Sequence, residues 1–371
     1  MERIYLDWAA GAPLHPAARE ALERALALGA GNPSSVHREG RAARALLERA
    51  REQVAALVGC EPREVIFTGS ATEANAFAVR GAGGDGLILV GAAEHPSVLQ
   101  AAAAAARAGA RVRTLPCDTH GVVRLDEVGS EPAALLALQL ANNETGVIQP
   151  VIEAAAAGRA LRAHVHCDAV QAAGKLDLHD VWARCDSLAL SAHKLGGLPG
   201  VGALALRRGA ELPALVPGHQ ERGFRGGTPA LPAIAAFGAV AEVALREREA
   251  RWSALAARTA TLERLLREVA PDAVIHGAGA ARVPGIVNVR FPGVDGETLL
   301  VALDLAGIAC SHGAACSTGA MEPSHVLLAM GLAAGEARST VRFSLGHETS
   351  EAALERLAAV LPDALRRARV A

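Results

Sequence analysis

Lysine is nearly absent from this chain, and the two lysines that remain are candidates for amine chemistry. Lys175 and Lys194 are the only lysines among 37 basic residues, so arginine fills the other basic positions. Arginine replaces lysine in most surface roles, but it stays protonated and cannot act as a neutral amine nucleophile. Lys194 follows an apolar run and precedes two glycines, a suitable place for a Schiff-base lysine. The alternative is that base composition favours arginine and that two lysines survived by chance.

Two further segments have the residue types that a phosphorylated aldehyde cofactor, pyridoxal phosphate, requires. Segment 68–75 lies between a predicted strand and a predicted helix, and it offers N–H groups and the Thr72 hydroxyl to a phosphate. Asp168 ends a predicted strand, where its carboxylate would keep a pyridine nitrogen protonated, and Gln171 would reach the ring's phenolic oxygen. Ordinary helix caps, including a capping box completed by Gln171, remain the alternative.

Two more polar residues follow predicted strands. His95 precedes Pro96 between a strand and a helix, where an imidazole would stack on the ring and move protons. Asn143, in an Asn-Asn-Glu-Thr-Gly segment, would donate a hydrogen bond to the ring oxygen. Each also fits the alternative of an ordinary loop residue.

Composition limits the classes of function. The chain has 371 residues, 51% of them hydrophobic and 20% charged, with a formal net charge of −2. This balance favours a globular enzyme with a large core and gives no electrostatic case for direct nucleic-acid or membrane binding. The first residues lack a signal-peptide core, and the six cysteines contain no CxxC pair. We therefore expect a cytoplasmic protein without a metal site.

Predicted strands alternate with predicted helices, which indicates an α/β fold with a mainly parallel sheet. Seven strands are expected in residues 65–67, 86–90, 111–115, 134–140, 164–167, 187–190 and 202–206. A long helix over 231–269 leads to further strands at 285–291 and 339–345 and helices at 297–305 and 351–367. The prediction is a large domain over 15–250 and a smaller α+β domain formed by 1–14 and 251–371.

The ordered set of motifs resembles the cysteine desulfurases, the NifS/IscS-like branch of the class V, fold-type I enzymes that depend on pyridoxal phosphate. The resemblance covers nearly the whole chain, from residue 5 to about residue 346. Each block is weak alone, but the order is specific. The blocks span residues 5–10, 31–35, 71–73, 94–95, 142–144, 168–171, 191–194, 220–228, 313–316, 322–324 and 341–346.

The resemblance implies a role for each matching residue. Lys194 would bind the cofactor as a Schiff base, Asp168 would pair with the pyridine nitrogen, and His95 would stack on the ring. Gln171 and Asn143 would contact the phenolic oxygen. The phosphate would be held by Ala71 (through its backbone), Thr72, Ser191 and His193, and by Thr228 of a second subunit, which implies a homodimer.

The resemblance also implies a substrate and a reaction. Arg342, assisted by Asn32, would bind the carboxylate of L-cysteine in bidentate fashion. Cys316 would accept the substrate's sulfur as a persulfide while alanine leaves. A sulfur-acceptor protein would take the persulfide for iron–sulfur cluster assembly or tRNA thiolation.

Two departures from the family pattern accompany these motifs. The phosphate loop reads Gly69-Ser70 where the family usually has Ser-Gly, which affects one phosphate contact. Cys310 lies six residues before Cys316, so it would either relay or trap sulfur or simply pack in the core.

The sequence leaves three hypotheses for the function. The first is a cysteine desulfurase. The second is a selenocysteine lyase or a small-amino-acid aminotransferase on the same fold, and an aminotransferase has no use for Cys316. The third is a catalytically silent scaffold in a sulfur-transfer complex, which the presence of Lys194, Asp168 and Cys316 disfavours.

Overall fold

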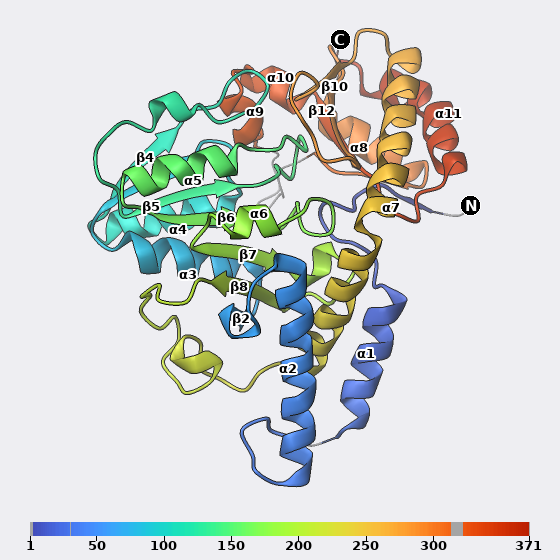
Figure 1. The fold of residues 1–371 in the computed structure, drawn as a ribbon. Coiled ribbons are helices and arrows are strands. Elements are labelled where there is room, and N and C mark those ends of the chain that lie inside the picture. Colours follow the sequence, from blue (N-terminus) through green and yellow to red (C-terminus); the bar gives the residue numbers. More distant parts are fainter. Residues whose placement is uncertain (1–2, 30, 313–321, 371) are drawn as a thin grey trace.

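A seven-stranded sheet forms the centre of the molecule (Figure 1). The computed structural model describes residues 3–29, 31–312 and 322–370. The strand order is β2-β8-β7-β6-β5-β3-β4; four neighbouring pairs are parallel, and β8 runs antiparallel to β2 and β7. The strands are β2 (Val65–Thr68), β3 (Leu87–Gly91), β4 (Arg111–Leu115), β5 (Leu135–Gln139), β6 (His164–Asp168), β7 (Ser187–Ser191) and β8 (Gly202–Leu206). The predicted mainly parallel seven-stranded sheet is confirmed.

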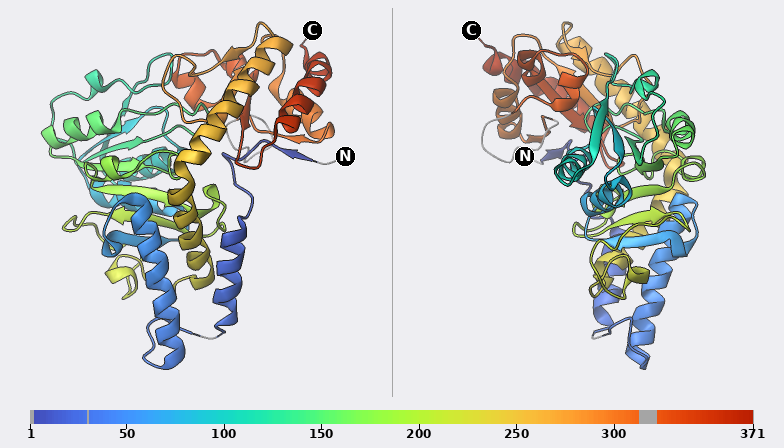
Figure 2. Two further views of the ribbon diagram at one scale, coloured as in Figure 1. Left: turned by 45° about the vertical axis from the view of Figure 1, so that its right-hand side comes forward. Right: turned by 90° about the vertical axis from the view of Figure 1, so that its left-hand side faces the viewer.

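Both faces of the sheet are covered by helices, as the apolar character of its strands requires. Helices α3 (Ala71–Gly83) and α4 (Pro96–Arg107) pack on one face, and α5 (Val151–Ala160), α6 (His179–Trp182) and α7 (Leu231–Val269) lie on the other (Figure 2). Alternate side chains of β3 point to opposite faces of the sheet. Leu87 and Leu89 pack in the larger core, whereas Ile88 and Val90 pack beneath α3 and α4.

Three long helices extend from the sheet at its β2 edge. Helices α1 (Pro16–Ala27) and α2 (Arg38–Val58) pack along the first part of α7 (Figure 1). His15 caps α1 by accepting from the Ala17 N–H, and Pro16 occupies the first helical turn, where its missing N–H costs nothing. Alanines and leucines on the facing sides fix these helices in the same core as the sheet.

The second part of α7 belongs to a separate hydrophobic core. Leu255, Leu262 and Leu266 pack with the small antiparallel sheet β12-β10-β9 and two helices. The elements are β9 (Val274–Ile275), β10 (Ile286–Arg290), α8 (Gly296–Leu305), β12 (Thr340–Ser344) and α11 (Glu351–Ala368); the short helices α9 (His325–Ala329) and α10 (Ala334–Arg338) lie beside them. The two cores support the predicted division near residue 250, which stays a prediction.

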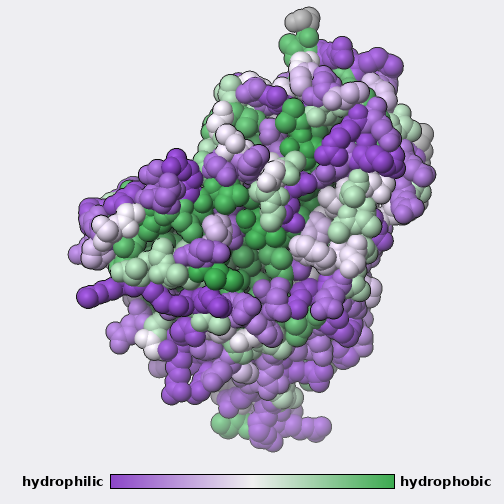
Figure 3. All heavy atoms as spheres, turned by 45° about the horizontal axis from the view of Figure 1, so that its top comes forward, coloured by the Kyte–Doolittle hydropathy of each residue, from purple (hydrophilic) through white to green (hydrophobic). Residues whose placement is uncertain are grey.

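The N-terminal segment crosses between the two parts of the molecule. Strand β1 (Ile4–Tyr5) pairs in parallel with β11 (Ile308–Ala309), and Leu6 is buried in the second core. Asp7 then bridges to Ser344 of β12, and Ala9 reaches the core of the large sheet. An apolar band between the two parts, framed by hydrophilic side chains, is visible in Figure 3. Within the described residues, no helix has both the length and the apolar character needed to cross a membrane.

Candidate active site

One edge of the large sheet collects the ends of its parallel strands. Strands β3, β5, β6 and β7 are parallel, and β2 runs in the same direction because β8 is antiparallel to both β2 and β7. Their carboxyl ends, at Thr68, Gly91, Gln139, Asp168 and Ser191, therefore meet at one edge, the usual ligand-binding edge of such sheets. The predicted residues of the large sheet follow directly after these strand ends.

Lys194 lies in the 3-10 turn Ala192–Lys194 that follows β7. Its Nζ donates to the carbonyl oxygens of Ala9 and Ala10, at 2.6 and 2.7 Å. Burial is the main cause that lowers the pKa of Lys194 to about 8; the positive charge of Arg342 adds to this, and nearby carboxylates oppose it. Roughly one-tenth of this amine is therefore neutral at pH 7, far more than for an ordinary lysine, and a nucleophilic lysine must be neutral to react.

Asp168 is fixed by a buried network. Its Oδ1 accepts from the Val170 N–H at 3.0 Å and its Oδ2 accepts from Asn75 Nδ2 at 2.7 Å. The Asn75 Oδ1 lies 2.9 Å from His166 Nε2, and burial lowers the pKa of His166 to about 3, so this imidazole is neutral. The Asp168 carboxylate thus caps the following turn through Oδ1, as the helix-cap alternative predicted. Its Oδ2 is bound by Asn75, which belongs to helix α3.

His95 caps helix α4 and is also tied to this network. Its Nδ1 accepts from the Ser97 N–H at 3.1 Å and lies 2.8 Å from Ser97 Oγ, which in turn accepts from Asn75 at 2.9 Å. Since Nδ1 serves as the acceptor, the proton of a neutral imidazole sits on Nε2. Burial lowers the pKa of His95, and Asp168 and Lys194 both act on it electrostatically, so these three predicted residues lie together.

The amino end of α3 is the candidate phosphate site. Ser70 caps the helix by accepting from the Glu73 N–H at 3.1 Å, which leaves the first N–H groups, those of Ala71 and Thr72, at the open end of the helix. Gly202 lies beneath this turn, and a Cβ on it would lie 2.5 Å from the Ser70 carbonyl carbon. The close approach therefore requires glycine.

Two further predicted phosphate ligands lie at the end of β7 and in the turn that follows it. Ser191 Oγ lies 2.8 Å from His193 Nδ1. Burial, helped by the charge of Lys194, lowers the pKa of His193 to about 4, so its ring is neutral at neutral pH. A neutral imidazole and a hydroxyl are hydrogen-bonding groups suited to a phosphate that helix α3 already attracts.

Gln171 does not complete a capping box. Its Nε2 donates to the Ala9 carbonyl at 2.8 Å, the same oxygen that accepts from Lys194. The amide therefore faces Lys194 and the N-terminal segment.

Arg342 reaches the site from β12 of the small sheet. Its Nη2 donates to Asp7 at 2.7 Å and its Nη1 donates to the Asn143 carbonyl at 2.9 Å, while its side chain is almost completely buried. Its Nε has no partner among the described residues. The structure therefore brings Arg342 and Asn143 together, and the charge of Arg342 acts on Lys194.

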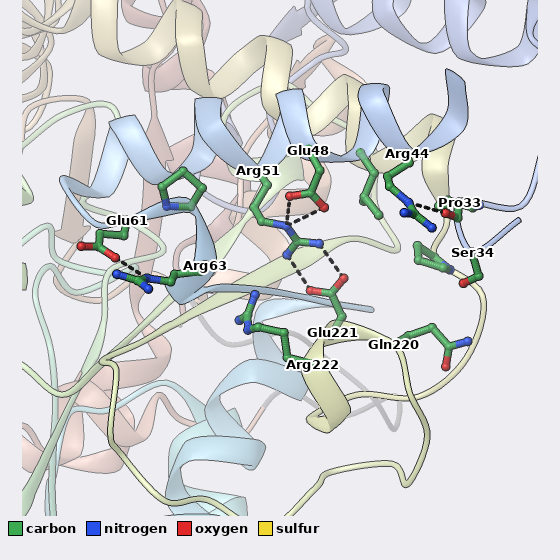
Figure 4. A pocket seen from close by; sticks show the side chains of 13 residues that line it. Pro33, Ser34, Arg44, Glu48, Arg51, Glu61, Arg63, Gln220, Glu221 and Arg222 are labelled. Carbon is green, nitrogen blue, oxygen red and sulfur yellow. Dashed lines mark hydrogen bonds and ion pairs between the residues drawn. The ribbon is translucent and has the colours of Figure 1, made fainter. Parts of the chain in front are cut away.

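The last two predicted residues, Asn32 and Thr228, lie in connecting segments of the large domain, and Thr228 lines a pocket together with Thr68 and Gly69 at the end of β2. Asn32, in the connection between α1 and α2, accepts from the Ser34 N–H at 2.9 Å, and Thr228 is exposed. Their neighbours Ser34 and Pro229 line a pocket of about 680 Å³ (Figure 4). Within one chain neither residue meets Arg342, so both roles stay predictions.

The floor of this pocket is a buried ion pair. Arg51 of α2 and Glu221 form two hydrogen bonds, at 2.8 and 2.9 Å, drawn in Figure 4. Glu221 also accepts from the Phe67 N–H at 2.8 Å. Farther along, Arg225 donates to Glu73 at 2.9 Å, and Glu73 accepts from the Gly69 N–H at 3.0 Å. These bonds attach segment 220–228 to the phosphate loop.

The predicted nucleophile Cys316 lies outside the described residues. The five cysteines that the structure describes are free thiols. Burial, with a smaller contribution from Asp7, raises the pKa of Cys310 well above its ordinary value. Cys310 is therefore a poor nucleophile, which favours packing over sulfur relay.

Several residues of the site were not singled out from the sequence. Asp7 and the carbonyls of Ala9 and Ala10 hold Arg342 and Lys194, and Asn75 holds Asp168. The signal for Asp7, Ala9 and Ala10 was their place in the first family motif; Asn75 had only its position one turn after the phosphate loop.

Comparison with known proteins gives one consistent result. Residues 4–357 match the model of the aminotransferase class-V family. A cysteine desulfurase of Klebsiella pneumoniae is 40% identical over 376 residues, covering 100% of this chain and 94% of the relative. An IscS-like cysteine desulfurase of Mycobacterium tuberculosis is 39% identical, covering 98% and 97%. The structure of a NifS-like protein from Rickettsia africae is 28% identical, with a TM-score of 0.89 and coverage of 98% and 99%.

Proposed function

The chain belongs to the aminotransferase class-V family, and from this premise we propose that it is a pyridoxal-phosphate-dependent cysteine desulfurase. The observation that carries the proposal is the convergence of Lys194, Asp168 and Arg342 at the carboxyl edge of the sheet. A lysine with a pKa of about 8, a fixed carboxylate and a buried guanidinium are the groups that an amino acid and this cofactor require. We choose L-cysteine as the substrate because relatives that match along the whole chain are named cysteine desulfurases.

The donor set fits pyridoxal phosphate. The N–H groups at the start of α3, with Thr72, Ser191 and His193, suit a phosphate, and Asp168 suits a protonated pyridine nitrogen. Gln171 and Asn143 would contact the phenolic oxygen, His95 would stack on the ring, and Lys194 would bind the aldehyde. When bound, this cofactor supplies an electron sink for the electrons released at the substrate's α-carbon.

The chain's own residues orient the substrate and move its protons. Arg342 presents two N–H groups to the carboxylate of L-cysteine, a bidentate geometry that places the α-carbon in a fixed position. Lys194 Nζ takes the α-proton, for which its lowered pKa suits it. Arg342 is buried and Lys194 is partly buried, which limits the access of water to the reacting atoms.

Cys316 would complete the reaction by accepting sulfur. Its thiolate attacks the sulfur of the substrate, and the carbon–sulfur bond breaks. The electron pair of that bond stays with the β-carbon, which takes up a proton and becomes the methyl group of alanine. The sulfur stays on Cys316 as a persulfide, so the step needs no external oxidant.

The partners and location extend the same proposal. The persulfide passes to a sulfur-acceptor protein of iron–sulfur cluster assembly or tRNA thiolation. Thr228, with Asn32, serves the site of a second subunit in a homodimer, and the exposure of Thr228 beside Thr68 and Gly69 supports this role. Free thiols at all five described cysteines fit a reducing compartment, and we place the protein in the cytoplasm.

The test is the release of alanine and sulfide from L-cysteine in the presence of a reductant. We expect equal amounts of both products from wild type and their loss in Cys316→Ala, while the protein keeps its yellow cofactor. Cys310→Ala is the matched control and should retain activity, because its buried thiol is not the nucleophile. Product formation that survives Cys316→Ala would instead support a lyase or an aminotransferase.

A further inference from the structure

The chain's other lysine lies beside the same site. Lys175 follows the turn after β6, and it lines a small cavity of about 70 Å³ together with Lys194, Trp8 and Ala9. Its Nζ donates to the backbone carbonyl of Gln171 at 3.0 Å and lies 3.5 Å from the Gln171 Oε1. Thus the only two lysines in the chain meet at one cavity, although only Lys194 has a role so far.

A short series of contacts connects the two amines. Lys175 holds the oxygen side of the Gln171 amide, and the nitrogen side donates to the Ala9 carbonyl at 2.8 Å. The same carbonyl accepts from Lys194 at 2.6 Å. Because an amide has one acceptor side and one donor side, a cation at Oε1 selects the orientation that points Nε2 toward Lys194.

We propose that Lys175 is a positioning residue of the active site, which orients the Gln171 amide and places a second cation at the cavity that holds Lys194. This inference rests on the proposed function. It assigns to Lys175 the role of making the catalytic Lys194 easier to deprotonate. Lys175 does not touch the substrate; it acts through Gln171 and through the electric field at Lys194.

The electrostatics of the cavity support this role. Burial, and next the charge of Lys194, lower the pKa of Lys175 to about 8. Repulsion between two ammonium groups is mutual, so a protonated Lys175 makes Lys194 easier to deprotonate, in addition to the burial and the Arg342 charge that lower the pKa of Lys194. Within the part of the chain that the structure describes, the two Nζ groups donate to the carbonyls of Gln171, Ala9 and Ala10 and to the Gln171 amide oxygen, and none of these acceptors is a carboxylate.

Other charged groups also face these lysines. Asp7 and Asp168 raise the pKa of Lys194, and Arg342 lowers it. Arg251 of α7 and His347 line the same cavity. Arg251 is paired with Glu247 at 2.8 Å, so its charge is compensated within its own helix. Arg251 therefore provides a matched control, because it is a cation at the same cavity whose charge is balanced by Glu247.

The experiment is a pH titration of the visible absorbance of the bound cofactor in the full-length holoenzyme, for wild type, Lys175→Met, Lys175→Arg and Arg251→Met. We expect the midpoint to rise in Lys175→Met, by about one pH unit. Lys175→Arg keeps the charge and should leave the midpoint at or below the wild-type value. Arg251→Met should leave it unchanged. An unchanged midpoint in folded Lys175→Met, or an equal rise in Lys175→Arg, would overturn the proposal.

A second measurement separates this inference from the proposed function. In the cofactor-free full chain, an amine-selective reagent can modify only the two lysines and the N-terminus, so peptide mass spectrometry reports Lys194 directly. The pH at which Lys194 becomes half-reactive should rise in Lys175→Met and not in Arg251→Met. This readout needs neither cysteine nor cofactor, so it stands even if no desulfurase activity is found. Lys175→Gln replaces Lys175→Met if that variant fails to fold, with the same expected rise.

Discussion

The molecule buries positive charge in two contrasting ways. At the pocket beside α2, Arg51 is matched by Glu221 through two hydrogen bonds of 2.8 and 2.9 Å. Burial alone would lower the pKa of Arg51, but the hydrogen bond and charge of Glu221 outweigh it and raise the pKa. At the active site, Lys175 and Lys194 face neutral carbonyl groups, and burial lowers both pKa values to about 8.

The difference separates a structural charge from a reactive one. The paired charge fixes shape: Glu221 and Arg222 both have left-handed backbones, with φ of 45° and 57°, and the ion pair holds this strained turn in place. The unpaired charges fix reactivity, because an amine that is costly to protonate is available as a nucleophile and base. This contrast predicts the following results.

Replacement of Lys194 should abolish turnover. Lys194→Ala removes both the amine that binds the cofactor and the base that takes the α-proton, so we expect a loss of activity of at least about 10³-fold. Lys194→Arg should be equally inactive, because it restores the charge but not a neutral amine. Alanine formation from L-cysteine is the measurement. Activity of Lys194→Arg near the wild-type level would contradict the assignment.

Removal of one partner of the Arg51–Glu221 pair should destabilise the fold without acting through the chemistry. Arg51→Met leaves the Glu221 carboxylate buried without its partner, which costs about 3–5 kcal/mol of unfolding free energy. The double variant Arg51→Met with Glu221→Met removes both charges and should recover most of this loss. Denaturant titration gives the values. A double variant as unstable as the single one would show that the pair is not a compensated unit.

The shape of Arg342 should matter as well as its charge. Arg342→Lys keeps a cation but loses the planar pair of donors that engages Asp7 and Asn143, so we expect kcat/KM for L-cysteine to fall by roughly 100-fold. Steady-state kinetics measures the change, with Arg338→Lys on the exposed surface as the control. Full activity of Arg342→Lys would exclude bidentate binding of the carboxylate.

The unpaired lysines should give a pH-dependent stability in the cofactor-free chain. Their folded pKa values of about 8 lie below the value of about 10.4 for an unfolded lysine. Below pH 8 both lysines are protonated in the folded and in the unfolded chain, so the folded chain bears the full free-energy cost of burying two charged amines. Between about pH 8 and 10 the unfolded state binds more protons, so the unfolding free energy rises, by roughly 2 kcal/mol for each lysine.

The difference between variants isolates this contribution. Lys175→Met should show a smaller rise between pH 8 and 10 than wild type, because one of the two shifted groups is gone. Denaturant titrations at each pH provide the comparison. An identical pH dependence in both proteins would mean that Lys175 is not a shifted, buried charge.

The sequence predicted elements with strong patterns and missed those held by distant contacts. The boundaries of α7 are the predicted 231–269, and all seven strands of the large sheet were expected. The two-residue strands β1, β9 and β11 are too short to leave a pattern. The glycine-rich stretch 81–86 has the composition of a surface loop, yet α3 continues through Gly83, where a Cβ would lie 2.4 Å from Ile88 Cδ1.

The site divides in the same way. Asp168 and Lys194 follow strands, so their position at the sheet edge could be predicted from local sequence. Lys194 donates to the backbone carbonyls of Ala9 and Ala10. Every residue has such a carbonyl, so the amino-acid types at these positions could not predict the contact. The Asn75–Asp168 contact joins residues 93 positions apart, and only the folded chain reveals it.

The most direct test of the central claim is a single-turnover reaction. The full-length holoenzyme is mixed with one equivalent of L-cysteine per subunit without reductant, and its peptides are then mapped by mass spectrometry. We expect alanine in the same amount as one additional sulfur atom on the peptide that contains Cys316, with the other five cysteines unmodified. Alanine formed without sulfur on Cys316, or sulfur found instead on Cys310, would contradict it.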